Sequence, residues 1–324
     1  MQFFTPVSLP APPFRLEPHS HVLVLGSCFA EHMGQHLIDT LPEGNVVVNP
    51  FGVVYGEHVL HDCLQHLLEG QASWSEHNFF EDAQGLWHSW AHSGAFNAPT
   101  RSACVARCRS AFESSNSLLH KAQLLIVTLS TDRHYRLQED DEAIVANCHK
   151  QPARLFREEA CELDEQIARW RRLIGLLLQR HPQLQVLFTL SPYRYAKYGL
   201  HENQISKAKL LLLIDQLCRQ YASCHYFPAY EIILDQLRDY RFYKPDMLHP
   251  SEQAIDYVWQ QFSAWSFSPT LQEFSAQRSA ILRDLQHRPL HPESAAHQHF
   301  LRRLEARLAD FKQQWGVSPL GAQD

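Results

Sequence analysis

The segment HVLVLGSCFAE, residues 21–31, constrains the fold more than any other part of this chain. Residues 22–25 are four consecutive apolar residues, a short run typical of a strand buried on both faces. Gly26 then permits a sharp turn that a residue with a Cβ would resist. Apolar side chains recur at helical spacing over residues 29–41. The segment therefore predicts a strand, a tight turn and a helix, with Ser27 at the turn.

Ser27 admits two interpretations at such a turn. Serine is a favoured N-cap residue, and from the turn alone capping is the simpler role. The same position also lets a hydroxyl project beyond the carboxyl edge of the sheet, beside helix N-terminal amides that can stabilise an oxyanion. The turn therefore predicts a cap or a nucleophile, and one serine can serve as both.

Asp246 and His249 lie three residues apart in the segment YRFYKPDMLHP, residues 240–250. Two prolines flank them, so a turn or a short loop is expected here instead of a continuous helix. Within one turn, the carboxylate can fix the tautomer of the imidazole while the imidazole takes the proton of a serine hydroxyl. Alone, such a pair is more often a surface turn with a local ion pair. Combined with Ser27 at the first strand-to-helix turn, it predicts a Ser-His-Asp triad.

Strand and helix patterns alternate along the rest of the chain, without internal repeats. The buried-strand candidates after the first are residues 46–48, 124–129, 184–190 and 225–227. Helical patterns cover residues 55–68, 101–121, 162–180, 205–221, 231–237 and 252–265, the last with Ser251 as its cap. This alternation predicts an α/β fold, a three-layer α/β/α sandwich with a mostly parallel sheet.

Three regions fall outside this alternation. Residues 71–99 are rich in aromatic side chains and are expected to form an inserted hairpin or an irregular loop. Residues 136–149 have the pattern of a hairpin, with an acidic turn at 139–142. Residues 266–324 are polar and helical in pattern. We therefore expect a main domain over residues 1–265, followed by a C-terminal helical extension that packs on the core or on a partner.

Charge and composition exclude several classes of protein. The 324 residues include 29 basic and 35 acidic side chains, a net charge of −6, with no basic tract. This balance speaks against nucleic acid or an anionic membrane as the main partner. No apolar run approaches the length of a membrane span, and the N-terminal residues do not have the pattern of a signal peptide. The eight scattered cysteines are expected to be reduced thiols, and the expected compartment is the cytoplasm.

The motif GSCFA at residues 26–30 is the signature of the GSCFA-domain family, which is related to the SGNH (GDSL-like) hydrolases, and the chain resembles that family well beyond this motif. Further similar blocks are NPFGVVY at 49–55, NCHK at 147–150, TLSPYR at 189–194, NQISK at 203–207 and YFPAYEIILDQLRDYRFYKPDMLHPSE at 226–252. The resemblance spans roughly residues 20–265. It implies that Ser27 corresponds to the SGNH nucleophile, and Asp246 and His249 to the DxxH pair.

The same resemblance indicates where donors to an oxyanion should lie. The amide of Ser27 is one donor. SGNH enzymes usually supply the others from a Gly amide after the second strand and an Asn side chain after the third. The turn NPFG at 49–52 matches the second-strand position. Gly52, or Asn49 through its side-chain amide, is therefore a candidate, and a plain Asn-Pro turn fits this segment equally well.

The third-strand position departs from the SGNH pattern. The sequence there is STDRHY, without Gly-x-Asn-Asp, and the GSCFA family more often has Gly where Ser130 stands. Thr131 or the later Asn147 is the candidate replacement for the missing amide donor. Arg194, just past the fourth strand, is expected either to pair with an anionic substrate group or to be a structural partner of a carboxylate.

Two rival chemistries deserve comparison with the triad. The chain has 21 histidines, including His88 and His92 four apart and His134 and His149 around the predicted hairpin, but no HExxH and no Cys/His ligand spacing. No Gly-rich phosphate loop is present either, so neither a metal nor another cofactor is predicted. Cys28 is the alternative nucleophile, since a thiol at a helix N-terminus has a lowered pKa. A packed first-turn residue is the simpler interpretation of Cys28.

Together these features predict a hydrolase of the SGNH kind that cleaves an ester through an acyl-enzyme on Ser27. His249 would act as base and then as acid, with Asp246 orienting it. The substrate is expected to be a small-molecule or carbohydrate ester, such as a glycan acyl ester, and the acceptor either water or a sugar hydroxyl. The alternative is a non-catalytic ligand-binding module on the same fold. The sequence leaves the oligomeric state open.

Overall fold

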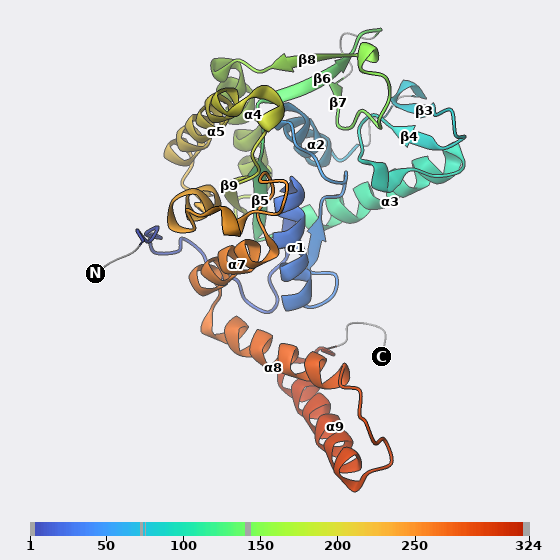
Figure 1. Ribbon diagram of the computed structural model, residues 1–324, viewed down its shortest axis with the longest axis vertical. Coiled ribbons are helices and arrows are strands. Elements are labelled where there is room, and N and C mark those ends of the chain that lie inside the picture. The colour runs from blue at the N-terminus through green and yellow to red at the C-terminus, as the bar shows by residue number, and fades with distance from the viewer. Residues whose placement is uncertain (1–3, 72–73, 75, 140–143, 320–324) are drawn as a thin grey trace.

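A five-stranded parallel sheet, in the order β10-β9-β5-β1-β2, forms the centre of the computed structural model, which describes residues 4–71, 74, 76–139 and 144–319 (Figure 1). Its strands are β1 (Val22–Gly26), β2 (Val46–Val48), β5 (Leu124–Leu129), β9 (Gln185–Leu190) and β10 (Cys224–Tyr226). In the register, Gly26 lies opposite Thr128, and Leu129 lies opposite Leu190. The strand ends that precede the predicted site residues therefore meet at one edge of the sheet.

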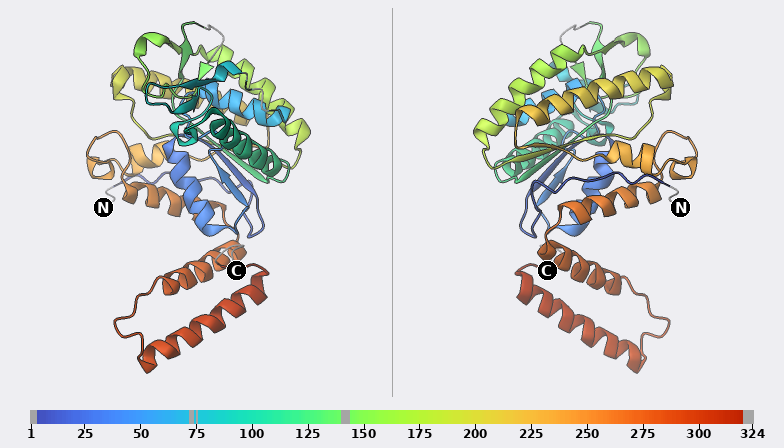
Figure 2. Two further views of the ribbon diagram at one scale, coloured as in Figure 1. Left: turned by 90° about the vertical axis from the view of Figure 1, so that its right-hand side faces the viewer. Right: turned by 90° about the vertical axis from the view of Figure 1, so that its left-hand side faces the viewer.

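Helices cover both faces of this sheet, because its central strands are apolar on both sides. Leu23 and Leu25 of β1 belong to one hydrophobic cluster, whereas Val22 and Val24 belong to the other. The first cluster is covered by α2 (Glu57–Glu69), α3 (Arg101–Leu119), α4 (Leu163–Arg180) and α5 (Leu200–Gln220). The second is covered by α1 (Cys28–Thr40) and α7 (Glu252–Ser266). Figure 2 shows these layers on opposite sides of the sheet, which confirms the predicted three-layer sandwich.

Two small sheets are added to this core. Strands β3 (Phe79–Glu81) and β4 (Trp87–Ser89) form the antiparallel hairpin expected within residues 71–99. Strand β6 (Arg133–Leu137) pairs with β7 (Ile144–Val145), as the predicted second hairpin requires, and also with β8 (Phe156–Ala160). Most of the expected acidic turn lies outside the described residues. Strand β8 was not predicted, because its sequence FREEA has no apolar alternation and the strand is formed by its ladder with β6.

The chain after β10 completes the second layer. Where one helix was expected over residues 231–237, the structure has α6 (Ala229–Glu231) followed by a π-helical segment, Ile232–Gln236. Ser251 caps α7 as predicted, since its hydroxyl accepts a hydrogen bond from the amide of Ala254.

The C-terminal residues form a helical hairpin of α8 (Pro269–Leu285) and α9 (Ala295–Trp315). It extends away from the sheet on the side of α1 and α7 (Figure 1). The rings of Phe274 and Phe311 pack between the two helices, with centroids 5.2 Å apart. Arg278 of α8 donates to backbone carbonyls of Ile38, Asp39 and Leu41 at the end of α1. The predicted helical appendage is therefore present. Over the described residues, no helix is long and apolar enough to cross a membrane.

Candidate active site

The turn between β1 and α1 has the strand–glycine–helix form that the sequence predicts. Gly26 has φ +146°, and a Cβ there would lie 2.5 Å from the carbonyl oxygen of Thr128 on β5, so only glycine fits without a shift. Ser27 is the N-cap residue of α1, with φ −74° and ψ −179°. Its side chain makes no capping hydrogen bond. Its Oγ is fully buried and has no hydrogen-bond partner among the described residues.

Asp246 and His249 lie together in a loop, as their spacing predicts. Asp246 Oδ2 is 2.5 Å from His249 Nδ1, and Asp246 Oδ1 accepts hydrogen bonds from the backbone amides of Leu248 and His249. These amide bonds, with the imidazole contact, lower the pKa of Asp246 to about 2. An ionised carboxylate only accepts hydrogen bonds, so Nδ1 carries the proton and Nε2 is left as the acceptor. This is the tautomer that a general base needs.

Arg194 holds this loop through its backbone and its side chain. The amide of Arg194 donates to the carbonyl of Leu248 at 3.2 Å, and Nη1 donates to the carbonyl of Met247 at 3.1 Å. The guanidinium also lies over the rings of Tyr240 and Tyr243. Met247 has φ +59°, a left-handed conformation that these contacts help to fix. The contacts of the Arg194 side chain are therefore with a carbonyl and two tyrosine rings, instead of the carboxylate considered from the sequence.

The loop and the turn are linked through Tyr193. The rings of Tyr193 and His249 are 4.4 Å apart between centroids. Burial, and after it the charges of Asp246 and Cys28, raise the pKa of Tyr193, so this ring lies near both groups. No hydrogen bond joins His249 to Ser27, because Ser27 Oγ has no partner within the described residues. The structure thus brings Asp246 and His249 together but leaves Ser27 unconnected to them.

Cys28, the first residue of α1, is the partly exposed group of the turn. Burial raises the pKa of its thiol, and the backbone amide of Phe29 opposes this rise. The charge of the thiolate reaches Tyr55 and Tyr193, whose pKa values it raises after the larger effect of burial. Of the two neighbouring residues, Cys28 is therefore the partly exposed one and Ser27 the buried one.

Lys207 lies beneath this edge of the sheet and was not singled out from the sequence. It is 1% exposed, and its Nζ donates to the carbonyls of Ser130 at 2.6 Å and Ser191 at 2.8 Å. These two carbonyls are the exits of β5 and β9, so Lys207 ties the two strand ends together. Burial lowers the pKa of its ammonium group to about 7. Only the block NQISK pointed to this position, without indicating a role.

Asn49 and Gly52, the second-strand candidates, differ in what they can still donate. Asn49 has φ +46°, and its Oδ1 accepts from the amide of Gly26 at 2.8 Å. Its Nδ2 is buried and has no hydrogen-bond partner among the described residues. The amide of Gly52 already donates to the carbonyl of Asn49 at 2.7 Å. A Cβ on Gly52 would lie 1.8 Å from Ser93 Oγ, so this glycine serves the turn. The free donor of the pair is Asn49 Nδ2.

Thr131 and Asn147, the third-strand candidates, are both used in local turns. Thr131 Oγ1 accepts from the amide of Arg133 at 3.2 Å and lies 3.5 Å from the hydroxyl of Ser206. Asn147 Oδ1 accepts from the amide of His149 at 2.8 Å, beyond β7. Neither contact involves the β1–α1 turn.

Potential metal ligands converge at a different place. In the described part of the chain, one group of His, Cys, Asp or Glu donors meets closely enough to hold an ion, and it consists of His58, His134 and Cys161. Of the histidines that the sequence drew attention to, His88 and His149 instead contact each other at 3.2 Å, and His92 contacts Ser89 at 2.9 Å.

Comparison with known families agrees with the motif. The model of the GSCFA family matches residues 21–262, and that of the GSCFA domain protein, C-terminal domain, matches residues 279–318. No curated protein matches the chain. The first match covers more than half of the 324 residues and includes both the β1–α1 turn and the loop of Asp246 and His249. The chain belongs to the GSCFA family.

Proposed function

We propose that this protein is a hydrolase of the SGNH kind that cleaves ester bonds by acyl transfer at the β1–α1 turn. The observation that carries the proposal is the contact between Asp246 Oδ2 and His249 Nδ1, in a loop held by two further amide bonds to Asp246. A buried, fully paired histidine would be structural. This imidazole is 40% exposed, so its Nε2 is available as a base.

The reaction follows from the groups around the turn. The nucleophile attacks the ester carbonyl while His249 Nε2 takes its proton, with Asp246 stabilising the imidazolium. The oxyanion receives hydrogen bonds from the amides at the start of α1 and from Asn49 Nδ2, which has no other partner among the described residues. Collapse of the intermediate breaks the ester C–O bond, and the imidazolium protonates the departing alcohol. Water, or a sugar hydroxyl, then takes the acyl group by the reverse sequence.

Access distinguishes the two candidate nucleophiles. Ser27, predicted from the sequence, is fully buried and would need its side chain to turn outward before it attacks. Cys28 is partly exposed at the same helix N-terminus. Because burial raises the pKa of Cys28, its resting form is the thiol, and it needs a base to remove the proton. We assign this role to His249, the exposed imidazole of the neighbouring loop, and place Cys28 ahead of Ser27 as the attacking group.

Acylation by a simple activated ester tests the proposal. The purified protein is mixed with p-nitrophenyl acetate, quenched in acid, and the acetylated residue identified by peptide mass spectrometry. We expect a burst of nitrophenol and acetyl on Cys28, with the burst lost in Cys28→Ala and kept in Ser27→Ala. Acetyl on Ser27, with the reverse pattern, would assign the serine. If there is no burst, and neither Ser27 nor Cys28 is acetylated, the proposed hydrolase activity would be overturned.

A non-catalytic ligand-binding module is the second candidate, favoured by the unpartnered hydroxyl of Ser27. Such a module should bind acylated sugars equally well as wild type, Ser27→Ala and Cys28→Ala, with no turnover in any of them. Calorimetric titration with an O-acetylated oligosaccharide separates the two functions, because an enzyme consumes this ligand.

A further inference from the structure

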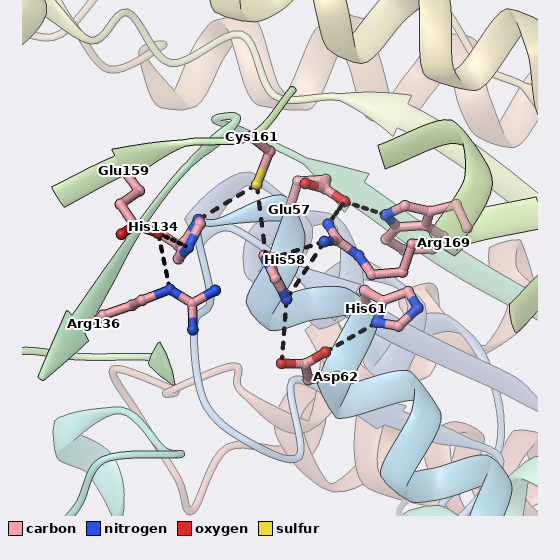
Figure 3. Close-up of polar contacts among 10 residues, drawn as sticks. Glu57, His58, His61, Asp62, His134, Arg136, Glu159, Cys161 and Arg169 are labelled. Carbon is pink, nitrogen blue, oxygen red and sulfur yellow. Dashed lines mark hydrogen bonds and ion pairs between the residues drawn. The ribbon is translucent and has the colours of Figure 1, made fainter. Parts of the chain in front are cut away.

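His58, His134 and Cys161 form a cluster that the proposed hydrolase does not use. His58 is on the first turn of α2, His134 is on β6, and Cys161 follows β8. Figure 3 shows the three side chains pointing toward one another from these separate segments. Cys161 Sγ lies 3.4 Å from His134 Nδ1 and 3.8 Å from His58 Nδ1. All three donor atoms lie within 4.8 Å of one another.

These distances fit a shared metal ion. In tetrahedral zinc sites, with Zn–S of about 2.3 Å and Zn–N of about 2.0 Å, sulfur and nitrogen ligands stand about 3.6 Å apart. The two observed Sγ–Nδ1 distances, 3.4 and 3.8 Å, lie on either side of this value. One thiolate and two imidazoles form a donor set that suits Zn²⁺ and similar ions, and not Mg²⁺ or Ca²⁺, which prefer oxygen.

The second nitrogen of each imidazole faces a carboxylate. His134 Nε2 is 3.4 Å from Glu159 Oε2, and His58 Nε2 is 3.9 Å from Asp62 Oδ2, the second an ion-pair distance. These nearby carboxylates favour the tautomer with the proton on Nε2, in which the lone pair of each Nδ1 is available on the side of Cys161. The single S–H proton can serve only one of these lone pairs. A cation at the centre satisfies both, and carboxylate–histidine–metal chains are the usual second shell of zinc sites.

The charges around the cluster leave room for a cation. Arg169 lies nearest, but its Nη2 is paired with the fully buried carboxylate of Glu57, 2.6 Å away. Its Nη1 is 3.1 and 3.4 Å from the two ring nitrogens of His58. An ion bound at His58 Nδ1 would therefore displace Nη1 from this nitrogen, while Nη2 stays paired with Glu57.

We propose that His58 Nδ1, His134 Nδ1 and Cys161 Sγ bind a Zn²⁺-type ion, with a water molecule as the fourth ligand. Binding forms one metal–sulfur and two metal–nitrogen bonds and releases the thiol proton of Cys161 to solvent. The ion would join α2 to the small sheet of β6 and β8, whose own hydrophobic cluster has three buried members, Trp90, Val145 and Phe156. From this position the ion would fix the small sheet to the α/β core.

Metal content and cobalt spectra test the site on the full chain. Protein expressed with added zinc is measured by elemental analysis; after chelation, Co²⁺ is titrated while the thiolate-to-cobalt absorption is followed. We expect about one zinc per chain and a thiolate–cobalt band in wild type, both lost in Cys161→Ser. The matched control is Cys148→Ser, a partly buried thiol beyond β7 that is outside the cluster and should keep both signals.

A milder variant covers the case in which Cys161→Ser does not fold. Glu159→Gln keeps all three ligands and removes the carboxylate behind His134, and should weaken zinc binding roughly tenfold. Wild-type protein without zinc and without a thiolate–cobalt band would overturn the proposal and leave a hydrogen-bonded cluster only. Equal loss of metal in Cys148→Ser and Cys161→Ser would also overturn it, because binding would then not depend on this cluster.

Discussion

The β1–α1 turn and the cluster around Cys161 are both polar, but they differ in access to solvent. In the loop that forms the open site together with this turn, the side chains of Asp246 and His249 are 43% and 40% exposed. In the cluster, those of His58 and His134 are 16% and 4% exposed. A base that exchanges protons with a substrate has to be reached from outside, whereas ligands of a structural ion are better closed off from water. Exposure therefore separates a site suited to reaction from one suited to holding the fold.

The strongest test of this contrast is His249→Ala. Loss of a general base should lower kcat/KM for the activated ester by roughly 10²- to 10⁴-fold. Zinc content should stay that of wild type, because His249 belongs only to the open site. Esterase kinetics and elemental analysis on the same sample measure both. A loss of less than threefold would remove His249 from the chemistry, and a parallel loss of zinc would show that the two sites are not separate.

Gly26→Ala should be the most damaging change to the frame of the open site. The new Cβ would lie 2.5 Å from the carbonyl oxygen of Thr128, at φ +146°. We expect a loss of about 2–3 kcal/mol in the free energy of unfolding, measured by denaturant titration. The control is Gly44→Ala, where φ is +82° but no atom lies within 4 Å of the new Cβ. That change should cost only about 1 kcal/mol. Equal losses would mean that the contact with Thr128 is unimportant.

Lys207 gives the open site a pH dependence of stability. Its folded pKa of about 7 is below the ordinary value of about 10.4. Below pH 7 the folded state has to hold a buried charge, and this cost is relieved as the pH rises toward the unfolded pKa. The unfolding free energy of wild type, relative to Lys207→Met, should therefore rise by about 2 kcal/mol from pH 7 to pH 9. Taking the difference between the two proteins cancels the titration of cysteines and tyrosines. A flat difference would show that Lys207 keeps its charge in the fold.

The two sites also differ in how far the sequence alone predicted them. The β1–α1 turn and the Asp246–His249 pair each lie in one contiguous motif, and the apolar runs of the central strands brought both to the same edge of the sheet. Sequence patterns of this kind do not predict the direction in which each side chain points. Ser27 and Cys28 are neighbours in sequence, yet the first is buried and the second partly exposed. The sequence therefore located the turn without choosing between hydroxyl and thiol.

The cluster of His58, His134 and Cys161 was not predicted from the sequence, for a different reason. Cys161 lies 103 residues from His58 and 27 from His134, and no ligand spacing links them. They meet because β8 pairs with β6 in a register that sets His134 opposite Glu159. Strand β8 has no hydrophobic pattern, so neither the strand nor the register was predicted, and the ligand set depends on both. The sequence predicted the residues that lie within one contiguous motif. It did not predict a site whose residues are brought together by strand pairing.

Arg194→Lys should have the smallest effect and decides between the two roles considered for this residue. Lysine keeps the charge but loses the planar fork that lies over Tyr240 and Tyr243 and donates to Met247. If Arg194 positions the loop of His249, kcat should fall by about tenfold or less while KM stays constant. A rise in KM with constant kcat would instead indicate an anionic group of the substrate. Arg238→Lys is the control, because Arg238 lines one surface pocket together with Arg194 but is 82% exposed and pairs with Asp235. Steady-state kinetics with neutral and acidic acyl esters separate the two roles, since only a substrate-binding arginine discriminates between them.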